Sequence, residues 1–84
     1  MTRNQAAKYI QKALGDDFDV RVEDWPEKQR MILVRKMPSM ARFWIEVSTG
    51  NFDHGVTDCY KGKENSFRTI RECADYVIQK MSAA

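Results

Sequence analysis

Cysteine is scarce in this sequence, because Cys59 and Cys73 are the only two among 84 residues. A small secreted domain of this length needs more cysteines to build a disulfide framework. The two could pair with each other, but the N-terminus lacks the basic segment followed by an apolar segment that marks a secretion signal. We therefore expect a cytoplasmic protein with both thiols reduced, and with Cys73 buried as a small core residue.

Long apolar runs are also missing. The longest aliphatic run spans residues 31–34, whereas a membrane-spanning helix needs about 20 apolar residues. The overall composition is nevertheless that of a globular protein and not of a disordered tail, since 43% of the residues are hydrophobic and 31% are charged. A chain this short can form one core but no deep cleft with a second layer behind it. The sequence predicts a single domain over residues 1–84.

Residue types that build catalytic or metal sites are few. His54 is the only histidine, and it lies in a turn-rich segment where we expect a solvent-exposed loop. No other residue stands at metal-ligand spacing from it. The glycines are isolated from one another, which excludes a glycine-rich phosphate loop, and the acidic residues 16–19 lack the pattern of an EF-hand. The sequence therefore predicts a protein that is not an enzyme and that carries no metal or cofactor.

Two segments have the apolar spacing of amphipathic helices. Thr2 and Thr69 each stand three residues before a Gln or Glu, a capping box in which both side chains satisfy free backbone donors. The first helix is predicted over residues 3–14, followed by a C-terminal cap at Gly15. In the second segment, the spacing of the apolar residues fits one face of a helix and excludes the alternation of a strand. Its members are Ile70, Cys73, Ala74, Val77, Ile78 and Met81.

Between these helices, alternating apolar and polar residues predict strands. The first strand covers residues 18–23, the second runs from about residue 30 to 37, and the third covers residues 42–48. A short fourth strand could form near residues 56–60, while residues 61–65 are expected to form an exposed loop. Alternatively, residues 49–65 fold over the open face of the sheet.

The predicted fold class is α+β, in the order α-β-β-β-(β)-α, with an antiparallel sheet. Each helix has a single apolar stripe, so the simplest arrangement packs both helices on one face of the sheet. Eight apolar residues are expected to form the core between these layers. They are Ile10, Leu14, Val20, Phe43, Ile45, Ile70, Val77 and Ile78.

The face without helices is expected to carry apolar surface in excess of one core. The second strand is apolar on both sides, so either Met31 and Leu33 or their neighbours in the sequence must point outward next to Trp44. Arg42, two residues before Trp44, is expected on the same face. Aromatic and Met side chains within a rim of charges are typical of a protein-binding surface. The predicted partner-binding residues are Trp44, Arg42, Arg35, Met37, Met40 and Trp25.

Charge is distributed unevenly along the chain, although the net charge is only +2. Residues 16–27 carry six acids and one arginine, whereas residues 28–42 carry five bases and no acid. In adjacent antiparallel strands these two blocks would pair, although separate acidic and basic edges could instead each meet a partner. An alternative function is therefore a nucleic-acid-binding module that uses a basic sheet edge and loop. Its predicted residues are Arg30, Lys36, Lys61, Lys63, Arg68 and Arg71.

The order of the elements resembles that of double-stranded-RNA-binding domains and of the small Alu-binding subunits of the signal recognition particle. Double-stranded-RNA-binding domains open their last helix with a lysine cluster and carry a Gly-Pro-x-His loop, whereas this helix opens at residues 69–72 with Thr-Ile-Arg-Glu and no such loop occurs. Residues 67–69, Phe-Arg-Thr before an amphipathic helix, are similar to the end of the Arm-type DNA-binding domains of phage integrases.

A short domain without catalytic residues also resembles the small inhibitors and accessory proteins of phages and other mobile elements, including anti-CRISPR proteins. The leading hypothesis is therefore a small binding protein of inhibitor or adaptor type. We expect it to dock on another protein or on a nucleoprotein complex, and a homodimer is a further alternative.

Overall fold

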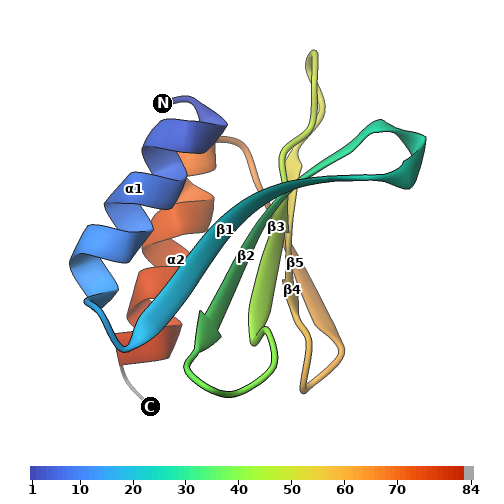
Figure 1. The fold of residues 1–84 in the computed structure, drawn as a ribbon. Coiled ribbons are helices and arrows are strands. Elements are labelled where there is room, and N and C mark those ends of the chain that lie inside the picture. The colour runs from blue at the N-terminus through green and yellow to red at the C-terminus, as the bar shows by residue number, and fades with distance from the viewer. Residues whose placement is uncertain (83–84) are drawn as a thin grey trace.

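The computed structural model describes residues 1–82, which form two α-helices and a five-stranded antiparallel sheet. The elements are α1 (Arg3–Leu14), β1 (Phe18–Trp25), β2 (Gln29–Lys36), β3 (Phe43–Glu46), β4 (His54–Asp58), β5 (Lys63–Phe67) and α2 (Ile70–Ser82). Strands that follow one another in the sequence are neighbours in the sheet, and both helices lie on one face of it (Figure 1). The predicted α+β class and the placement of both helices are confirmed.

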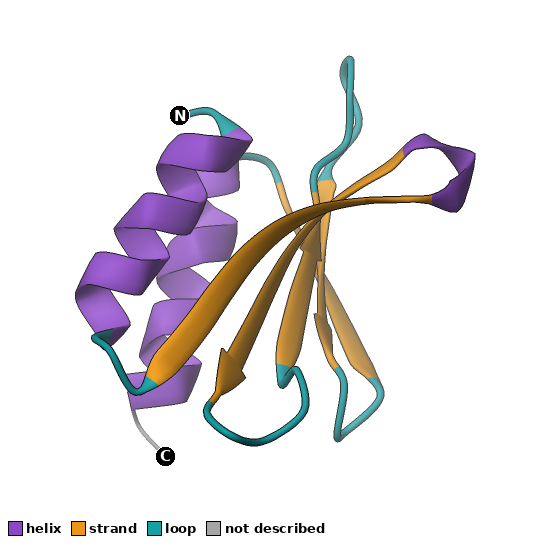
Figure 2. Cartoon of the chain, viewed as in Figure 1, coloured by secondary structure: helices purple, strands orange, loops and turns teal. Residues whose placement is uncertain are grey.

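Loops and turns gather at the two ends of the sheet (Figure 2). We call the end that carries residues 37–42 and 59–62 the lower end, since it lies at the bottom of Figure 1, where both helices also terminate. The upper end carries residues 47–53 and the start of both helices. A short 3-10 turn, η1 (Pro26–Lys28), joins β1 to β2 and projects to one side.

Both helices begin at the predicted capping boxes. At α1, the Thr2 hydroxyl accepts from the Gln5 backbone N–H at 3.1 Å, and the Gln5 side-chain Oε1 accepts from the Thr2 backbone N–H at 2.8 Å. At α2, Thr69 and Glu72 make the equivalent pair, with both distances at 3.1 Å. Gly15 closes α1 with a φ of +90°, a conformation that favours glycine. No helix within residues 1–82 is long and apolar enough to cross a membrane.

The core lies between the two helices and the inner face of the sheet. Strand β2 directs Ile32 and Val34 inward, where both are fully buried, and therefore directs Leu33 outward. Cys73 is also fully buried, as predicted. All eight predicted core residues belong to this cluster, either buried or packed against it at its border. The antiparallel register pairs Ile32 with Ile45, which in turn pairs with Val56, so apolar side chains continue from strand to strand.

Strand β5 is the element that the sequence analysis missed, because residues 61–65 were expected to form a loop. This strand has almost no apolar alternation, since its inward positions include Lys63 and Asn65. Asn65 can occupy such a position because its side-chain amide donates to the Tyr76 hydroxyl at 2.9 Å. Strands β4 and β5 widen the sheet and do not fold over its outer face, so that alternative is wrong.

Several strand boundaries also differ from the prediction. Strand β3 is shorter than the predicted residues 42–48, β1 extends to Trp25 beyond the predicted end at residue 23, and β4 begins two residues before the predicted residue 56. The extension follows from pairing, since Trp25 lies opposite Gln29 in the antiparallel register. The reversal itself occurs at Glu27 and Lys28, which have φ angles of 66° and 64°. As a result, both tryptophans of the chain stand on strands.

Candidate functional site

Two tryptophans meet on the outer face of the sheet, away from the helices. The ring centroids of Trp25 in β1 and Trp44 in β3 lie 5.1 Å apart with their planes at 81°, an edge-to-face arrangement that aromatic rings favour. The Trp25 indole N–H donates to a carboxylate oxygen of Glu23 at 3.2 Å, which fixes the ring orientation. Met31 stands on β2, the strand between them, and is only 2% exposed although it is outside the helix-side core.

These side chains line a shallow pocket of about 320 Å³. Its lining residues come from all five strands and the β4–β5 turn, and they are Trp25, Gln29, Met31, Trp44, Glu46, Gly55, Thr57, Gly62 and Glu64. Gly55 leaves part of the pocket open, because a Cβ atom built at this position would meet no atom within 4 Å. We refer to this hollow as the tryptophan pocket.

The rim of the tryptophan pocket is acidic. Glu46 and Glu64 are exposed, and among residues 1–82 neither makes an ion pair. Glu23, beside Trp25, adds a third carboxylate. Indole faces attract cations through their electron-rich surfaces, and nearby carboxylates strengthen that attraction. The pocket therefore has the composition that suits the basic side chain of a ligand.

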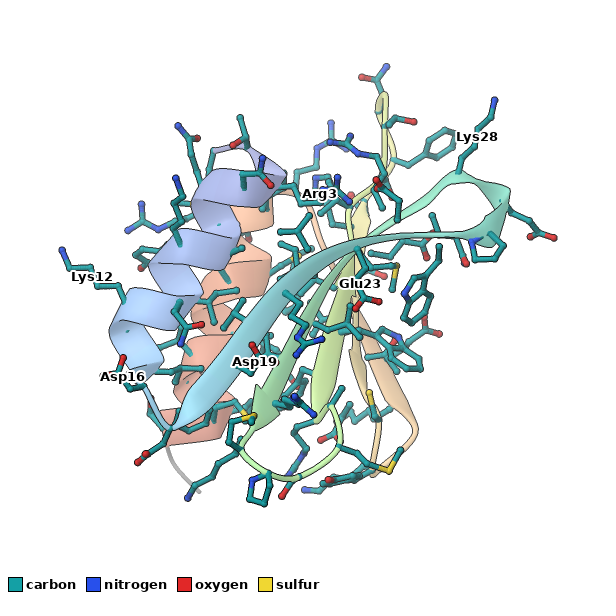
Figure 3. All side chains as sticks on the ribbon, viewed as in Figure 1. Arg3, Lys12, Asp16, Asp19, Glu23 and Lys28 are labelled. Carbon is teal, nitrogen blue, oxygen red and sulfur yellow. The ribbon has the colours of Figure 1, made fainter. Side chains whose placement is uncertain are left out.

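The neighbouring part of the outer face is held by an ion network. Asp19 accepts from Arg21 at 2.7 Å and from Arg35 at 3.1 Å, and the latter bond joins β1 to β2. Asp19 and Glu23 both lie along β1 (Figure 3). Burial raises the pKa of the Asp19 carboxyl, but the bonds from Arg21 and Arg35 outweigh that effect and hold its pKa below the usual value. The predicted pairing between the acidic and basic blocks is confirmed for Asp19 and Arg35.

Arg42 does not share the outer face with Trp44, so that part of the prediction is wrong. Its guanidinium donates to the carboxylate of Asp58 at 3.2 and 3.3 Å, at the lower end of the sheet. It also lies over the rings of Phe43 and Tyr60, with 5.4 and 5.3 Å to the ring centroids. Because Arg42 precedes β3, the alternation of that strand does not determine the direction of its side chain.

The two predicted methionines also lie at the lower end, apart from the tryptophans. Met37 and Met40 belong to the β2–β3 loop and are 47% and 79% exposed. Near them, the hydroxyl of Tyr60 donates to the carbonyl oxygen of Met40 at 3.4 Å. The structure thus brings together two of the six predicted partner-binding residues, Trp25 and Trp44. Arg35 lies elsewhere on the outer face, in the ion network of Asp19, and the other three lie at the lower end.

The basic residues of the alternative prediction do not form one continuous surface. Three of them lie toward the upper end, namely Arg30, Arg68 and Arg71. The other three lie toward the lower end, namely Lys36, Lys61 and Lys63. Two of the upper arginines have acidic partners, since Arg68 lies 3.9 Å from Asp53 and Arg71 lies 3.5 Å from Asp75. The predicted basic edge is therefore divided between opposite ends of the sheet.

His54 and the two cysteines are at least partly buried among other residues of the fold. His54 begins β4 and is half-buried, and its Nδ1 atom accepts from the Ser48 N–H at 2.9 Å. The prediction that this histidine lies in a solvent-exposed loop is therefore wrong. Burial and the adjacent Glu72 charge raise the pKa of Cys73 to about 12. Burial and the Asp58 charge also raise the pKa of Cys59. Both thiols therefore stay protonated at neutral pH and are weak nucleophiles.

Within the described part of the chain, no group of three or more His, Cys, Asp or Glu side chains is placed to hold a metal ion. Comparisons of the chain with protein-family models, with curated proteins and with solved structures give no match. The tryptophan pocket combines an aromatic floor with an acidic rim.

Proposed function

We propose that this protein is a non-enzymatic binding protein, of inhibitor or adaptor type, that docks on another protein through the outer face of its sheet. The main supporting observation is the Trp25–Trp44 pair, which is half-buried on a face that neither helix covers. Tryptophan is among the residues most enriched at the energetic centres of protein interfaces. A cytoplasmic setting is part of the proposal, because a chain whose two cysteines are both free suits a reducing compartment.

The partner is expected to insert an arginine or lysine side chain into the tryptophan pocket. A cation over an indole face contributes about 0.5–2 kcal/mol, depending on how far it is desolvated. Glu46 and Glu64 on the rim add charge attraction that steers such a partner toward the pocket. A second copy of this chain is the competing occupant, and sedimentation of the isolated protein distinguishes the two, since a monomer leaves the face to another protein.

Replacing Trp44 by Ala is expected to weaken partner binding by about 2 kcal/mol or more, roughly 30-fold. The variant should stay folded, because Trp44 is only partly buried and lies outside the helix-side core. The partner can be captured from host cells with a photo-crosslinking amino acid at position 46. Position 8, exposed on α1, serves as the crosslinking control. A binding titration and a thermal melt then measure the two effects separately.

A matched variant, Gly55→Val, fills the pocket without removing any contact. The position has free space for a Cβ atom, and β-branched residues favour strands, so the melting temperature should hold or rise. Binding should nevertheless fall at least as far as in Trp44→Ala. If Gly55→Val binds like the original protein, or if Trp44→Ala unfolds while its folded fraction still binds, the surface lies elsewhere.

A further inference from the structure

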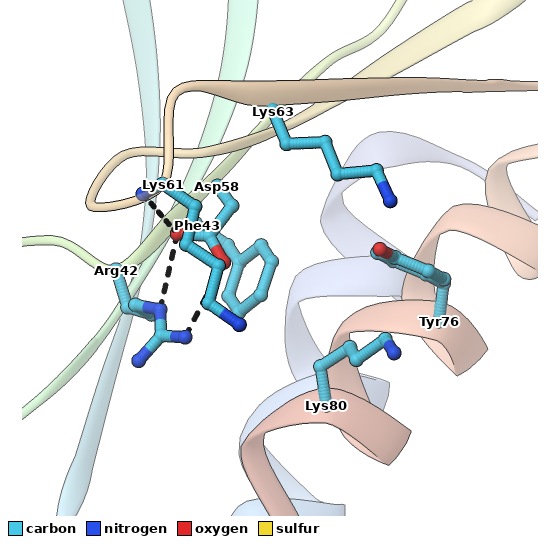
Figure 4. Close-up of a pocket in the computed structure, with 7 residues that line it drawn as sticks. All are labelled: Arg42, Phe43, Asp58, Lys61, Lys63, Tyr76 and Lys80. Atoms are coloured by element: carbon cyan, nitrogen blue, oxygen red, sulfur yellow. Dashed lines mark hydrogen bonds and ion pairs between the residues drawn. The ribbon is translucent and has the colours of Figure 1, made fainter.

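A second pocket lies on the inner side of the sheet, at the lower end, between the β4–β5 hairpin and α2 (Figure 4). Its volume is about 240 Å³. Since a water molecule takes about 30 Å³ in the liquid, the pocket has room for an anion of several non-hydrogen atoms. Four basic side chains line it, Arg42, Lys61, Lys63 and Lys80, against the single carboxylate of Asp58. Their formal charges sum to +3.

Asp58 and Arg42 neutralise each other and form one wall of this pocket. Asp58 is 8% exposed, and besides the two bonds from Arg42 it accepts from the backbone N–H groups of Tyr60 at 3.0 Å and Lys61 at 3.1 Å. The carboxylate therefore shapes the turn from which Lys61 extends. It also accepts from Nε and Nη2 of Arg42, so the charge of this guanidinium is already compensated inside the protein.

The three lysines have no such partner. Among residues 1–82, no carboxylate lies within ion-pair distance of Lys61, Lys63 or Lys80. They reach the pocket from two sides, Lys61 and Lys63 from the β4–β5 hairpin and Lys80 from the last turns of α2 (Figure 4). Three like charges around one hollow repel one another, so an anion bound between them would relieve that repulsion.

Tyr76 adds a directed hydrogen-bond donor to these charges. Its hydroxyl oxygen accepts from the side-chain amide of Asn65 at 2.9 Å, and among residues 1–82 its own proton has no acceptor. The Lys80 ammonium lies 5.5 Å from the centre of the Tyr76 ring. The hydroxyl proton is therefore free to donate to a ligand in the pocket.

We propose that this pocket binds the phosphate group of a phosphomonoester. Lysines act as point charges that can surround a tetrahedral anion, whereas a planar carboxylate is best matched by an arginine fork, and the Nε–Nη2 fork of the one arginine here already binds Asp58. A phosphomonoester carries about 1.5 to 2 negative charges at neutral pH and suits a site of high positive charge. The lysines surround one point and do not follow a line, so they fit a terminal phosphate better than a nucleic-acid backbone.

The phosphate could belong to a small molecule or to the 5′ end of a nucleic acid, and the test separates these sources. Calorimetric titration of the full chain with a nucleoside 5′-monophosphate should show one saturable site. Lys63→Gln and Lys80→Gln should each weaken it about tenfold or more, and Tyr76→Phe several-fold. Lys8→Gln, on the exposed side of α1, is the control and should leave affinity unchanged. A single-stranded oligonucleotide, with and without a 5′-phosphate, forms the second arm.

Tighter binding of the phosphorylated oligonucleotide assigns the site to a nucleic-acid end, and binding of the mononucleotide alone assigns it to a small molecule. Any of three results would overturn the proposal. The first is no saturable binding of the mononucleotide, and the second is that Lys8→Gln and Lys63→Gln weaken its binding equally. The third is equal affinity for the two oligonucleotides together with no effect of Tyr76→Phe on mononucleotide binding. The site shares no residue with the tryptophan pocket. Its failure therefore leaves the proposed docking face untouched.

Discussion

Replacing Phe43 by Ala is expected to lower the free energy of unfolding by about 3–5 kcal/mol. Phe43 is 1% exposed in the centre of the sheet, and its ring meets that of Tyr76 edge-to-face with 6.4 Å between centroids. The truncation removes buried apolar area and leaves a cavity between β3 and α2. Small domains have total free energies of unfolding of about 5–15 kcal/mol, so the variant would lose a large share of its stability.

Phe52→Ala is the matched control, because the same truncation there removes a side chain that is 76% exposed in the β3–β4 loop. Substitutions at such surface positions usually stay within about 0.5 kcal/mol. Denaturant unfolding of both variants measures the difference. Equal losses in the two would mean that the helices do not pack on β3 as described.

Asp58→Asn is expected to lower the free energy of unfolding by about 3 kcal/mol. The substitution removes the charge that compensates Arg42 and one of the oxygens that accept the side-chain and backbone bonds of the β4–β5 turn. A nearly buried ion pair that loses one partner leaves the other charge without compensation. Asp53→Asn is the control, since the Asp53 carboxylate makes only one contact among residues 1–82, a long 3.9 Å approach to exposed Arg68.

The Asp58 carboxyl also makes stability depend on pH. Burial raises its pKa, but the bonds from the Lys61 N–H, the Arg42 guanidinium and the Tyr60 N–H outweigh that effect and hold the pKa below the usual value of 3.8. Its stabilising contribution is therefore complete above that value and is lost as the pH falls through it toward the folded-state pKa. Asp19 acts in the same direction. Unfolding measured over acidic pH should show a shallower loss for Asp58→Asn, and parallel curves would contradict the assignment.

The elements that the sequence predicted well are those whose pattern is local. The capping boxes at Thr2 and Thr69 and the apolar stripes behind them specify both helices without tertiary information. The alternation around Ile45 likewise placed β3 and directed Trp44 outward. Strand β5 was missed because Asn65, a polar residue, takes an inward position there. A hydrogen bond to Tyr76 stabilises it, and this contact cannot be predicted from the spacing of apolar residues.

The candidate sites were predictable only in part for the same reason. Trp44 was expected on the outer face, but its contact with Trp25 depends on the β1–β2 register and on the continuation of β1 up to Pro26. Arg42 was misplaced because its direction is set by Asp58, a residue 16 positions away. Lys80 was not considered, because it lines the same pocket as Lys63 only once β5 has joined the sheet beside α2.

The most direct test of the docking face is to follow the indole N–H resonances of the ¹⁵N-labelled protein bound to its partner. Trp25 and Trp44 are the only tryptophans in the chain, and both lie on the outer face, so the two indole signals report on that surface alone. We expect both signals to shift and to gain protection from solvent exchange, while the amides of Lys8 and Lys12 on α1 stay unchanged. Unchanged indole signals, with shifts confined to the helices, would contradict docking through the tryptophan pocket.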